Sequence, residues 1–253
     1  MIIPILDNAS LLMMKTAGDL LSQVFATIAS NVVAGLSTAD LDSLIERELD
    51  ARKLVPGSKG YMGYKHASCI SLNDEVVHGI PSSKRFVNAG DLVKIDVCAS
   101  YHGFFADMAR SFLVPPIDES VRQFVNVARL ALDKGIVHAR EGNRLSDISA
   151  AIQREVESHG YGVVRDFAGH GIGRAMHEEP EILNYGVPGK GPILKVGMAL
   201  ALEPMITMKS YRVFVEHDGW TVRTVDGGLA AHVEDTVIIT DNGPMIITRS
   251  GRG

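Results

Sequence analysis

The sequence predicts an α+β fold made of two pseudo-symmetric halves, and an internal repeat is the main reason. Gly35 and Asp40 recur as Gly142 and Asp147, an offset of 107 residues (142 minus 35). Three more pairs keep this offset: Ile45 with Ile152, Arg47 with Arg154, and Glu48 with Glu155. In each half, helical patterns come first and strand-like patterns follow, so we expect two related helix–helix–strand–strand units.

Acidic residues also fall in register with this repeat. The offset carries Gly90 onto Gly197 and Asp96 onto Glu203, and both acids belong to apolar, strand-like stretches. Chance identities are a poor explanation for acids that align together with glycines. The repeat therefore predicts one functional site shared by the two halves.

The composition argues against several classes of protein. Hydrophobic residues make up 46% of the chain and the net charge is −5, so neither nucleic acid nor a membrane surface is an expected partner. The two cysteines, Cys69 and Cys98, do not make a disulfide framework. Residues 1–7 lack the features of a signal peptide, and no apolar run is long enough to span a bilayer. We expect a cytoplasmic protein.

The first half begins with two predicted helices. Apolar residues recur with helical spacing from Ser10 to Val33, and Gly35 is expected to end this helix. Ser37 or Thr38 then caps a second helix that buries Leu41 on its apolar side.

Two hairpins are predicted to follow. Residues 67–77 suggest a short hairpin that turns at Asn73-Asp74 and stops before Gly79-Ile80-Pro81. A longer hairpin combines an apolar run around Asp96 with a second run from Phe104 to Val114.

The second half repeats this order. Helices are expected from about Asp118 to Arg140 and from Leu145 to His159. From Gly160 onward the pattern favours strands, with loops at Asn184–Pro192 and Asp226–Gly228.

Two aspartates in the long hairpin are expected to lie close together. If the turn is centred on Tyr101-His102, Asp96 and Asp107 face each other, with Cβ atoms about 4.5–5.5 Å apart; a longer turn shifts this register. Such carboxylates can share a proton, pair with Lys94 or Arg110, or bind cations. For an isolated hairpin, two exposed aspartates that happen to align are the simpler interpretation.

The second half contributes three more groups, and together they favour cations. Glu203 ends one apolar strand, Glu234 begins another, and His170 lies between glycines, which let a ligand approach closely. Each alone is more often structural, but four carboxylates and one imidazole in apolar strands are costly to bury without cations. Oxygen donors with one nitrogen favour Mn, Fe, Co or Zn. Two such ions about 3.5–4 Å apart acidify a bridging water.

The ordered motifs of the chain resemble those of type I methionine aminopeptidases. This group belongs to the pita-bread family, which also includes proline dipeptidase, aminopeptidase P and creatinase. The motifs are His78-Gly79-Ile80-Pro81, Lys94-Ile95-Asp96-Val97, Asp107, Gly169-His170-Gly171-Ile172-Gly173, His177-Glu178-Glu179-Pro180, Glu203-Pro204-Met205, Asp218-Gly219-Trp220-Thr221 and Glu234.

The resemblance implies a pita-bread fold, in which helices pack on a curved, mainly antiparallel central sheet. It implies a single catalytic metallopeptidase domain over residues 1–253, with pseudo-repeat halves at about 10–115 and 116–248. It also implies two divalent ions, of Co, Mn, Fe or Zn, whose identity the sequence leaves open. The five implied ligands are Asp96, Asp107, His170, Glu203 and Glu234. Asp107 and Glu234 are expected to bridge both ions.

The activity implied is removal of the N-terminal methionine from newly made polypeptides by hydrolysis of the first peptide bond. By resemblance, His78 contacts the substrate nitrogen, His177 polarises the carbonyl, and Glu203 relays a proton to the leaving amine. The same resemblance offers four residues as the lining of the methionine pocket, with core packing as the alternative: Tyr61, Tyr64, Cys69 and Trp220.

The resemblance also implies a subtype, through the spacing of two motifs, and a set of binding partners. The short connection between His177 and Glu203 leaves no room for the insertion of type II enzymes. The expected partners are N-termini of nascent polypeptides, with the ribosome as a candidate, and we expect a monomer that binds neither nucleic acid nor membrane.

The chain departs from the family pattern in two places. Met62 and Lys65 stand in a motif that commonly reads Gly-Tyr-His-Gly-Tyr/Phe-Pro, which bears on the shape of the pocket. Asp235 follows the last ligand, where histidine is common, and is expected to add a charge near the metals.

Two other functions remain open on the sequence. One is an X-Pro-specific peptidase on the same fold. The other is a non-catalytic binding module that retains the fold, although such relatives typically lose metal ligands and all five positions are filled here.

Overall fold

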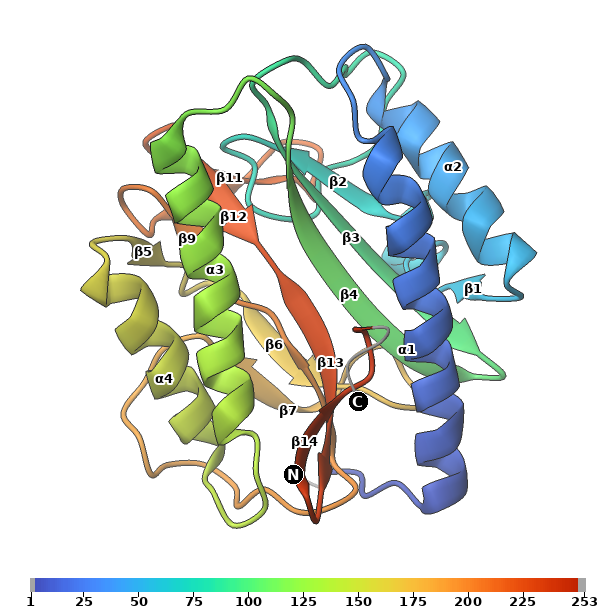
Figure 1. Cartoon of the computed structure of the whole chain (residues 1–253), viewed down its shortest axis with the longest axis vertical. Helices are drawn as coiled ribbons and strands as arrows, with labels where there is room; N and C mark the ends of the chain where they lie inside the picture. Colours follow the sequence, from blue (N-terminus) through green and yellow to red (C-terminus); the bar gives the residue numbers. More distant parts are fainter. Residues whose placement is uncertain (1–2, 250–253) are drawn as a thin grey trace.

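The computed structural model describes residues 3–249, which form a curved antiparallel sheet covered on one face by four helices (Figure 1). The helices are α1 Asn8–Ile28, α2 Thr38–Ala51, α3 Glu119–His138 and α4 Leu145–Ser158, with short 3-10 helices η1 Ala29–Asn31 and η2 Tyr61–Gly63. The strands are β1 Val55–Pro56, β2 Cys69–Leu72, β3 Leu92–Tyr101, β4 Phe104–Leu113, β5 Gly162–Val163, β6 Ala168–Gly171, β7 Glu178–Leu183, β8 Ala199–Leu202, β9 Met205–Thr207, β10 Val213–Val215, β11 Val222–Thr224, β12 Ala230–His232, β13 Glu234–Thr240 and β14 Gly243–Ile246.

The main sheet joins strands from both halves of the chain. Its order is β1-β3-β4-β13-β8-β6-β7, with β2 paired to β3 and β14 paired to β13, and every pairing is antiparallel. Strands β10 and β11 form a small sheet, and β12, β9 and β5 form another. The two halves meet where β4 pairs with β13, and in this pairing Ala109 lies opposite Glu234.

The predicted α+β fold with two pseudo-symmetric halves is confirmed. Helices α2 and α4 are both 14 residues long, and their first residues, Thr38 and Leu145, differ by the predicted 107. Strands β3 and β8 also begin 107 residues apart, at Leu92 and Ala199. The helices expected from Asp118 and Leu145 are present within two residues of their predicted ends.

The start of α2 shows why these helices begin where they do. The Ser37 side chain accepts a hydrogen bond from the Asp40 amide, and the Asp40 carboxylate accepts one from the Ser37 amide, both at 3.1 Å. Asp147, which is related to Asp40 by the repeat, likewise accepts from the Arg144 amide at 2.8 Å. The predicted cap at Ser37 is therefore confirmed, and its acidic half recurs at α4.

The first helix differs from its predicted bounds. It begins earlier, because the Asp7 carboxylate caps it by accepting from the Ser10 amide at 2.8 Å. It ends at Ile28 rather than Val33, because the chain tightens into η1 and the Asn31 side chain donates to the carbonyl of Thr27.

The predicted hairpin over residues 67–77 is wrong. Only β2 forms, and it pairs with β3 instead of with residues after the turn. The Glu75 carboxylate accepts a hydrogen bond from the Leu72 amide at 2.7 Å, so a side chain takes the place of a returning strand. The Val76 amide then donates to Val222 on β11.

The register predicted for the long hairpin is also wrong by two residues. Strands β3 and β4 turn at His102 and Gly103, which both have positive φ, as a two-residue hairpin turn requires. Asp96 therefore faces Ala109, and Asp107 faces Cys98. The two aspartates are diagonal neighbours on one face of the sheet.

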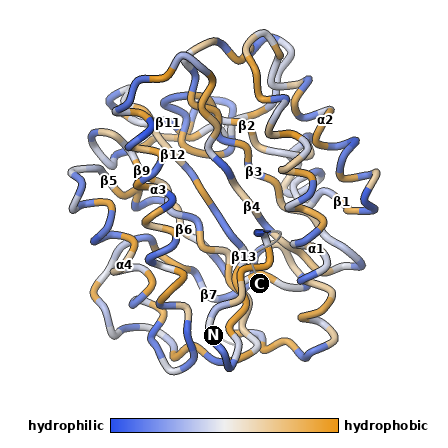
Figure 2. Tube along the Cα trace, viewed as in Figure 1, coloured by the Kyte–Doolittle hydropathy of each residue, from blue (hydrophilic) through white to orange (hydrophobic). Residues whose placement is uncertain are grey.

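The core lies between the helices and the sheet, in two large clusters. One cluster includes Leu21 of α1 and Leu41 of α2. The other includes Phe124 of α3 and Ile148 of α4. Hydrophilic and hydrophobic residues alternate along all four helices, as expected for helices with one buried face (Figure 2). Within residues 3–249, no helix combines the length and the apolar character needed to cross a membrane.

Candidate metal centre

Two aspartates of the central hairpin lie at the floor of a cavity. Burial raises the pKa of Asp96 well above its usual range, and the nearby Asp107 carboxylate raises it further. Burial raises the pKa of Asp107 to about 6, although hydrogen bonds from Cys98 and from the Met108 amide oppose this effect. Strand β13 fixes the backbone here, because the Asp107 amide donates to Thr236 Oγ1 at 2.8 Å.

Three more candidate ligands come from the second half of the chain. His170 lies on β6, Glu203 follows directly after β8, and Glu234 begins β13. The Nε2 atom of His170 is 3.5 Å from Glu203 Oε1 and 4.0 Å from Asp107 Oδ2. One ligand atom from each of Asp107, His170 and Glu234 lies within 4.8 Å of the other two. Acids and imidazole from both halves therefore meet at one place.

The glycines around His170 are needed for close approach of the backbone. A Cβ atom at Gly169 would lie 2.4 Å from the Ala201 carbonyl oxygen, and one at Gly171 would lie 2.1 Å from the Glu179 carbonyl oxygen. The His170 Nδ1 atom donates to the carbonyl of Gly171 at 2.9 Å. This leaves Nε2 as the unprotonated nitrogen that faces the acids.

The donors fit divalent cations better than they fit an internal counter-charge. The ammonium of Lys94 donates to the Asn73 carbonyl, and Arg110 pairs with Asp235 at 2.6 Å, so neither neutralises the cluster. Glu234 Oε1 is buried and has no hydrogen-bond partner among residues 3–249. A buried carboxylate oxygen without a donor is the arrangement expected where a cation binds.

A cavity of about 680 Å³ opens above these groups. The predicted site residues that line it are Tyr61, Tyr64, Cys69, His78, Asp96, Asp107, His170, His177, Glu203 and Trp220. Glu234, which is 2% exposed, is not part of this lining. The structure thus brings ten of the predicted residues to one cavity, with Glu234 close beside Asp107 and His170.

Two histidines line the cavity in surroundings that favour the neutral imidazole. Burial lowers the pKa of His78 to about 4 and also lowers the pKa of His177. The Tyr61 hydroxyl lies 3.1 Å from His177 Nδ1, and the rings of His170 and His177 are 4.4 Å apart. Tyr61 therefore orients His177, and His177 stands directly beside a candidate ligand.

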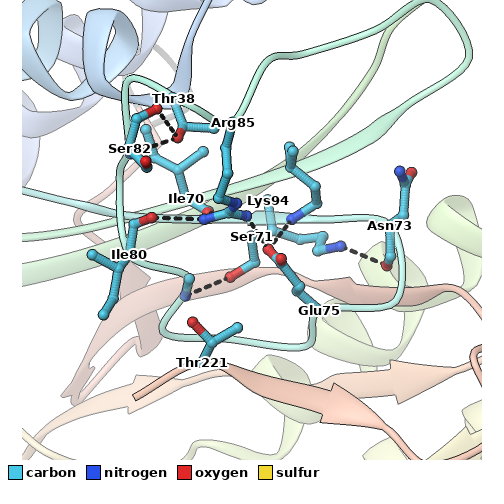
Figure 3. Close-up of polar contacts among 12 residues, drawn as sticks. Thr38, Ile70, Ser71, Asn73, Glu75, Ile80, Ser82, Arg85, Lys94 and Thr221 are labelled. Carbon is cyan, nitrogen blue, oxygen red and sulfur yellow. Dashed lines mark hydrogen bonds and ion pairs between the residues drawn. The ribbon is translucent and has the colours of Figure 1, made fainter. Parts of the chain in front are cut away.

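Three charged side chains, Glu75, Arg85 and Lys94, lie around the turn that contains Ile80 (Figure 3). His78 belongs to the same turn. His78 has φ of +59°, a left-handed conformation that costs energy for a residue with a Cβ atom. Arg85 donates to the Ile80 carbonyl at 2.6 Å and pairs with Glu75. Lys94, only 1% exposed, completes the group, and burial lowers its pKa to about 7.

Strand β2 fixes the same turn from the other side. The Gly79 amide donates to Ser71 Oγ at 3.0 Å, and the Ile70 amide donates to the Gly79 carbonyl at 2.8 Å. A Cβ atom at Gly79 would lie 2.3 Å from the Ile70 carbonyl oxygen, so only glycine fits. His78 is therefore presented by a turn that is fixed on both sides.

Asp235 does not leave an uncompensated charge at the cluster. Its carboxylate pairs with Arg110 at 2.6 Å and with Arg249 at 2.7 Å, and it accepts from Thr248 Oγ1 at 2.8 Å. Arg249 also pairs with Asp133 on α3. At this departure from the family pattern, Asp235 of β13 is part of a buried ion-pair network with Arg110 and Arg249.

The departures at Met62 and Lys65 affect the site unequally. Met62 lines the cavity, is 81% exposed and has φ of +46°, so its side chain stands at the rim. Lys65 is exposed and does not line the cavity.

The mouth of the cavity is acidic. Asp166, Glu179 and Glu181 contribute to its lining, in addition to the candidate ligands. In the described part of the chain, no lysine or arginine lines this cavity. Positively charged groups of a ligand are therefore favoured at its entrance.

Two residues at the site were missed by sequence reasoning. Asn184 donates to the backbone carbonyl of Glu203 at 3.0 Å. His232, two positions before Glu234, is buried, and its Nε2 atom lies 3.7 Å from Glu203 Oε2. A spacing of two near a strand indicates a shared face and offers a sequence clue for His232, whereas Asn184 has none.

Comparisons with known proteins agree on one family. The model of metallopeptidase family M24 matches residues 13–241. A methionine aminopeptidase of Clostridium acetobutylicum is 46% identical over 235 residues, covering 93% of this chain and 94% of that protein. The crystal structure of a methionine aminopeptidase from Thermotoga maritima superimposes with a TM-score of 0.96 at 42% identity, covering 98% of this chain and all of that one.

A more distant structure shares the fold alone. The prolidase of Pyrococcus furiosus has a TM-score of 0.78 and 21% identity, and this chain covers 66% of it. The predicted pita-bread fold is confirmed by these structural neighbours.

Proposed function

The chain belongs to metallopeptidase family M24, and from this membership we propose that it removes the N-terminal methionine of polypeptides by hydrolysing their first peptide bond. It is a metal-dependent hydrolase. The observation that carries the proposal is the convergence of acids and an imidazole from both halves at the floor of one cavity.

We assign two divalent ions to this centre. Asp96, Asp107, His170, Glu203 and Glu234 would hold them. When bound, such ions polarise a carbonyl and acidify a water molecule. The oxygen-rich donor set favours Co, Mn, Fe or Zn.

The surrounding side chains bind the substrate and move protons. His78 contacts the substrate nitrogen, and His177, oriented by Tyr61, donates to the carbonyl oxygen. Glu203 accepts the proton of the attacking water and returns it to the leaving amine. Exclusion of bulk water from the cavity floor strengthens each of these contacts.

The cavity wall accounts for the choice of the first residue. Tyr61, Tyr64, Cys69 and Trp220 form the apolar pocket, in which the Tyr64 and Trp220 rings are 4.9 Å apart. An unbranched, polarisable thioether suits such a wall. The free amino group of the substrate binds beside Asp96, which restricts the reaction to chain ends.

The proposal extends to the setting of the enzyme. Residues 1–253 form one catalytic domain, with halves at about 10–115 and 116–248, and act as a monomer. The substrates are newly made polypeptides in the cytoplasm, with the ribosome as a candidate partner.

The two rival functions have less support. An X-Pro-specific peptidase shares the fold, but the similarity to methionine aminopeptidases is much higher in identity and coverage. A non-catalytic module has no need for a complete set of buried carboxylates with raised pKa values.

A metal-titrated peptidase assay tests the proposal. The metal-free protein is loaded with Co, Mn, Fe or Zn and offered Met-Ala-Ser and an Ala-Pro peptide of equal length. We expect release of methionine from the first and no cleavage of the second. Cleavage of the Ala-Pro peptide alone would establish the X-Pro rival, and loss of all activity in every metal would favour the non-catalytic module.

A further inference from the structure

His232 is a fully buried histidine that makes no hydrogen bond through its ring. It ends β12 and is 1% exposed, and within the described residues neither ring nitrogen has a partner. Buried polar atoms are nearly always hydrogen-bonded, so an imidazole with two free nitrogens requires an explanation.

The nearest polar group is the carboxylate of Glu203. His232 Nε2 lies 3.7 Å from Glu203 Oε2, slightly beyond hydrogen-bonding distance, while His170 Nε2 lies 3.5 Å from Glu203 Oε1. The carboxylate therefore stands between two imidazoles, and each imidazole faces a different oxygen.

The backbones on both sides are fixed, so side-chain rotation alone can close this gap. Ser111 Oγ donates to the His232 carbonyl at 2.8 Å and accepts from the His232 amide at 3.3 Å. Asn184 donates to the Glu203 carbonyl at 3.0 Å.

We propose that His232 is a positioning residue, which donates a hydrogen bond from Nε2 to Glu203 Oε2 and thereby keeps Glu203 Oε1 directed at the cation held by His170. Without this donor, the Glu203 carboxylate can rotate about its Cγ–Cδ bond. Oε1 is then no longer held toward the cation, because either oxygen can take that position. Histidine suits the position because it supplies a donor without a full positive charge. A lysine or arginine there would compete with the cations for Glu203.

The proposal concerns the same site and rests on the proposed function only for its effect on catalysis. Its effect on metal affinity can be measured without substrate. A failure of the proposed function, seen as absent peptidase activity in wild type, therefore leaves the metal measurement informative.

Three substitutions test the role of the Nε2 donor. His232→Gln keeps an amide nitrogen near the Nε2 position, His232→Asn places one near Nδ1 instead, and His232→Leu removes the donor at similar volume. Manganese binding to each metal-free protein is measured by calorimetry, and the Co²⁺-loaded forms are compared by visible absorption. Thermal unfolding of the metal-free forms shows whether each variant folds.

We expect His232→Leu and His232→Asn to weaken manganese binding by about 10- to 100-fold, the usual cost of losing an outer partner of a ligand, and to alter the cobalt spectrum. His232→Gln is expected to stay within about threefold of wild type. Equal affinities for all four proteins, or an equal loss in the Gln and Leu variants, would overturn the proposal.

A measurement on the wild-type protein covers variants that fail to fold. In zinc-loaded protein labelled with ¹⁵N-histidine, the chemical shift of His232 Nε2 is expected to be that of a protonated ring nitrogen. A shift typical of an unprotonated Nε2 would overturn the proposal whatever the variants do.

Discussion

Asp107 is a candidate ligand of the metal centre, and it is 5% exposed. In Asp107→Asn the Met108 amide keeps an oxygen acceptor at the same place, so the local fold is preserved. We expect peptide hydrolysis to fall by at least about 10- to 100-fold, because a charged candidate ligand becomes neutral. The free energy of unfolding in urea is expected to differ by less than about 1 kcal/mol between the metal-free variant and metal-free wild type, because the substitution leaves no buried charge without a partner. Wild-type turnover in this variant would contradict the site.

His78 makes stability depend on pH in a direction that can be predicted. Burial lowers its pKa from 6.5 to about 4, so between these values the unfolded chain binds a proton that the folded protein does not. The contribution of neutral His78 to the free energy of unfolding is fully present above pH 6.5, and it is lost as the pH falls towards 4. We expect wild type to lose up to about 1.4 kcal/mol per pH unit more than His78→Gln in this window. Urea unfolding at equal metal content measures the difference, and parallel curves would contradict it.

The candidate ligands could be predicted from the sequence because they form a set. Asp96 and Glu203 fall on the same position of the repeat, and no single acid had to be judged alone. His232 belongs to no such set, so its position beside Glu203 is visible only in three dimensions.

Arg85 links an element of the fold to the chemistry. It holds the turn between β2 and β3 through the Ile80 carbonyl and pairs with the buried Glu75. In Arg85→Met, Glu75 keeps the hydrogen bond from the Leu72 amide but loses its guanidinium partner, and we expect the free energy of unfolding to fall by up to about 3 kcal/mol. Because the turn carries His78 with positive φ, kcat/KM is expected to fall as well.

A double-mutant cycle separates these two effects. If Arg85 acts on catalysis through His78, the loss of kcat/KM in Arg85→Met largely disappears when His78→Ala is already present. Lys84→Met, at the exposed neighbouring position, is the matched control and is expected to change neither quantity. Additive losses in the cycle would show that Arg85 has only a structural role.

Elements with regular periodicity were predicted well, and errors arose where a few turn residues decide the outcome. In the long hairpin, Tyr101 remains in β3 and the turn moves to His102 and Gly103. One residue of displacement in the turn shifts the pairing by two, which separates Asp96 from Asp107 along the strands. The prediction of the short hairpin failed because the Glu75 carboxylate accepts from the Leu72 amide and the Val76 amide then donates to Val222. The second contact joins residues far apart in the sequence, so local patterns do not contain it.

The cations are expected to bind the two halves of the molecule to each other. Candidate ligands come from the hairpin β3–β4 in the first half and from β6, β8 and β13 in the second. Removal of metal by a chelator should therefore lower the stability of the whole chain. We expect about 2.7 kcal/mol at free metal 100 times its Kd, measured as a shift in the urea midpoint.

The matched control for this effect is Asp107→Asn, in which added metal should stabilise much less. A chelator effect of the same size in both proteins would place the binding elsewhere. The pseudo-symmetry that underlies this prediction was visible in the sequence, because the offset of 107 residues relates helices and acids together.

The acidic mouth of the cavity has a consequence for how fast different peptides arrive. Asp166, Glu179 and Glu181 attract cationic substrates before contact, and the range of this attraction shrinks to about 8 Å at physiological ionic strength. The enzyme should therefore process Met-Ala-Lys faster than Met-Ala-Glu in dilute buffer, with the gap narrowing as sodium chloride is added. The charge of the third and later residues of a peptide is then expected to influence how fast its N-terminal methionine is removed, in addition to the effect of the second residue.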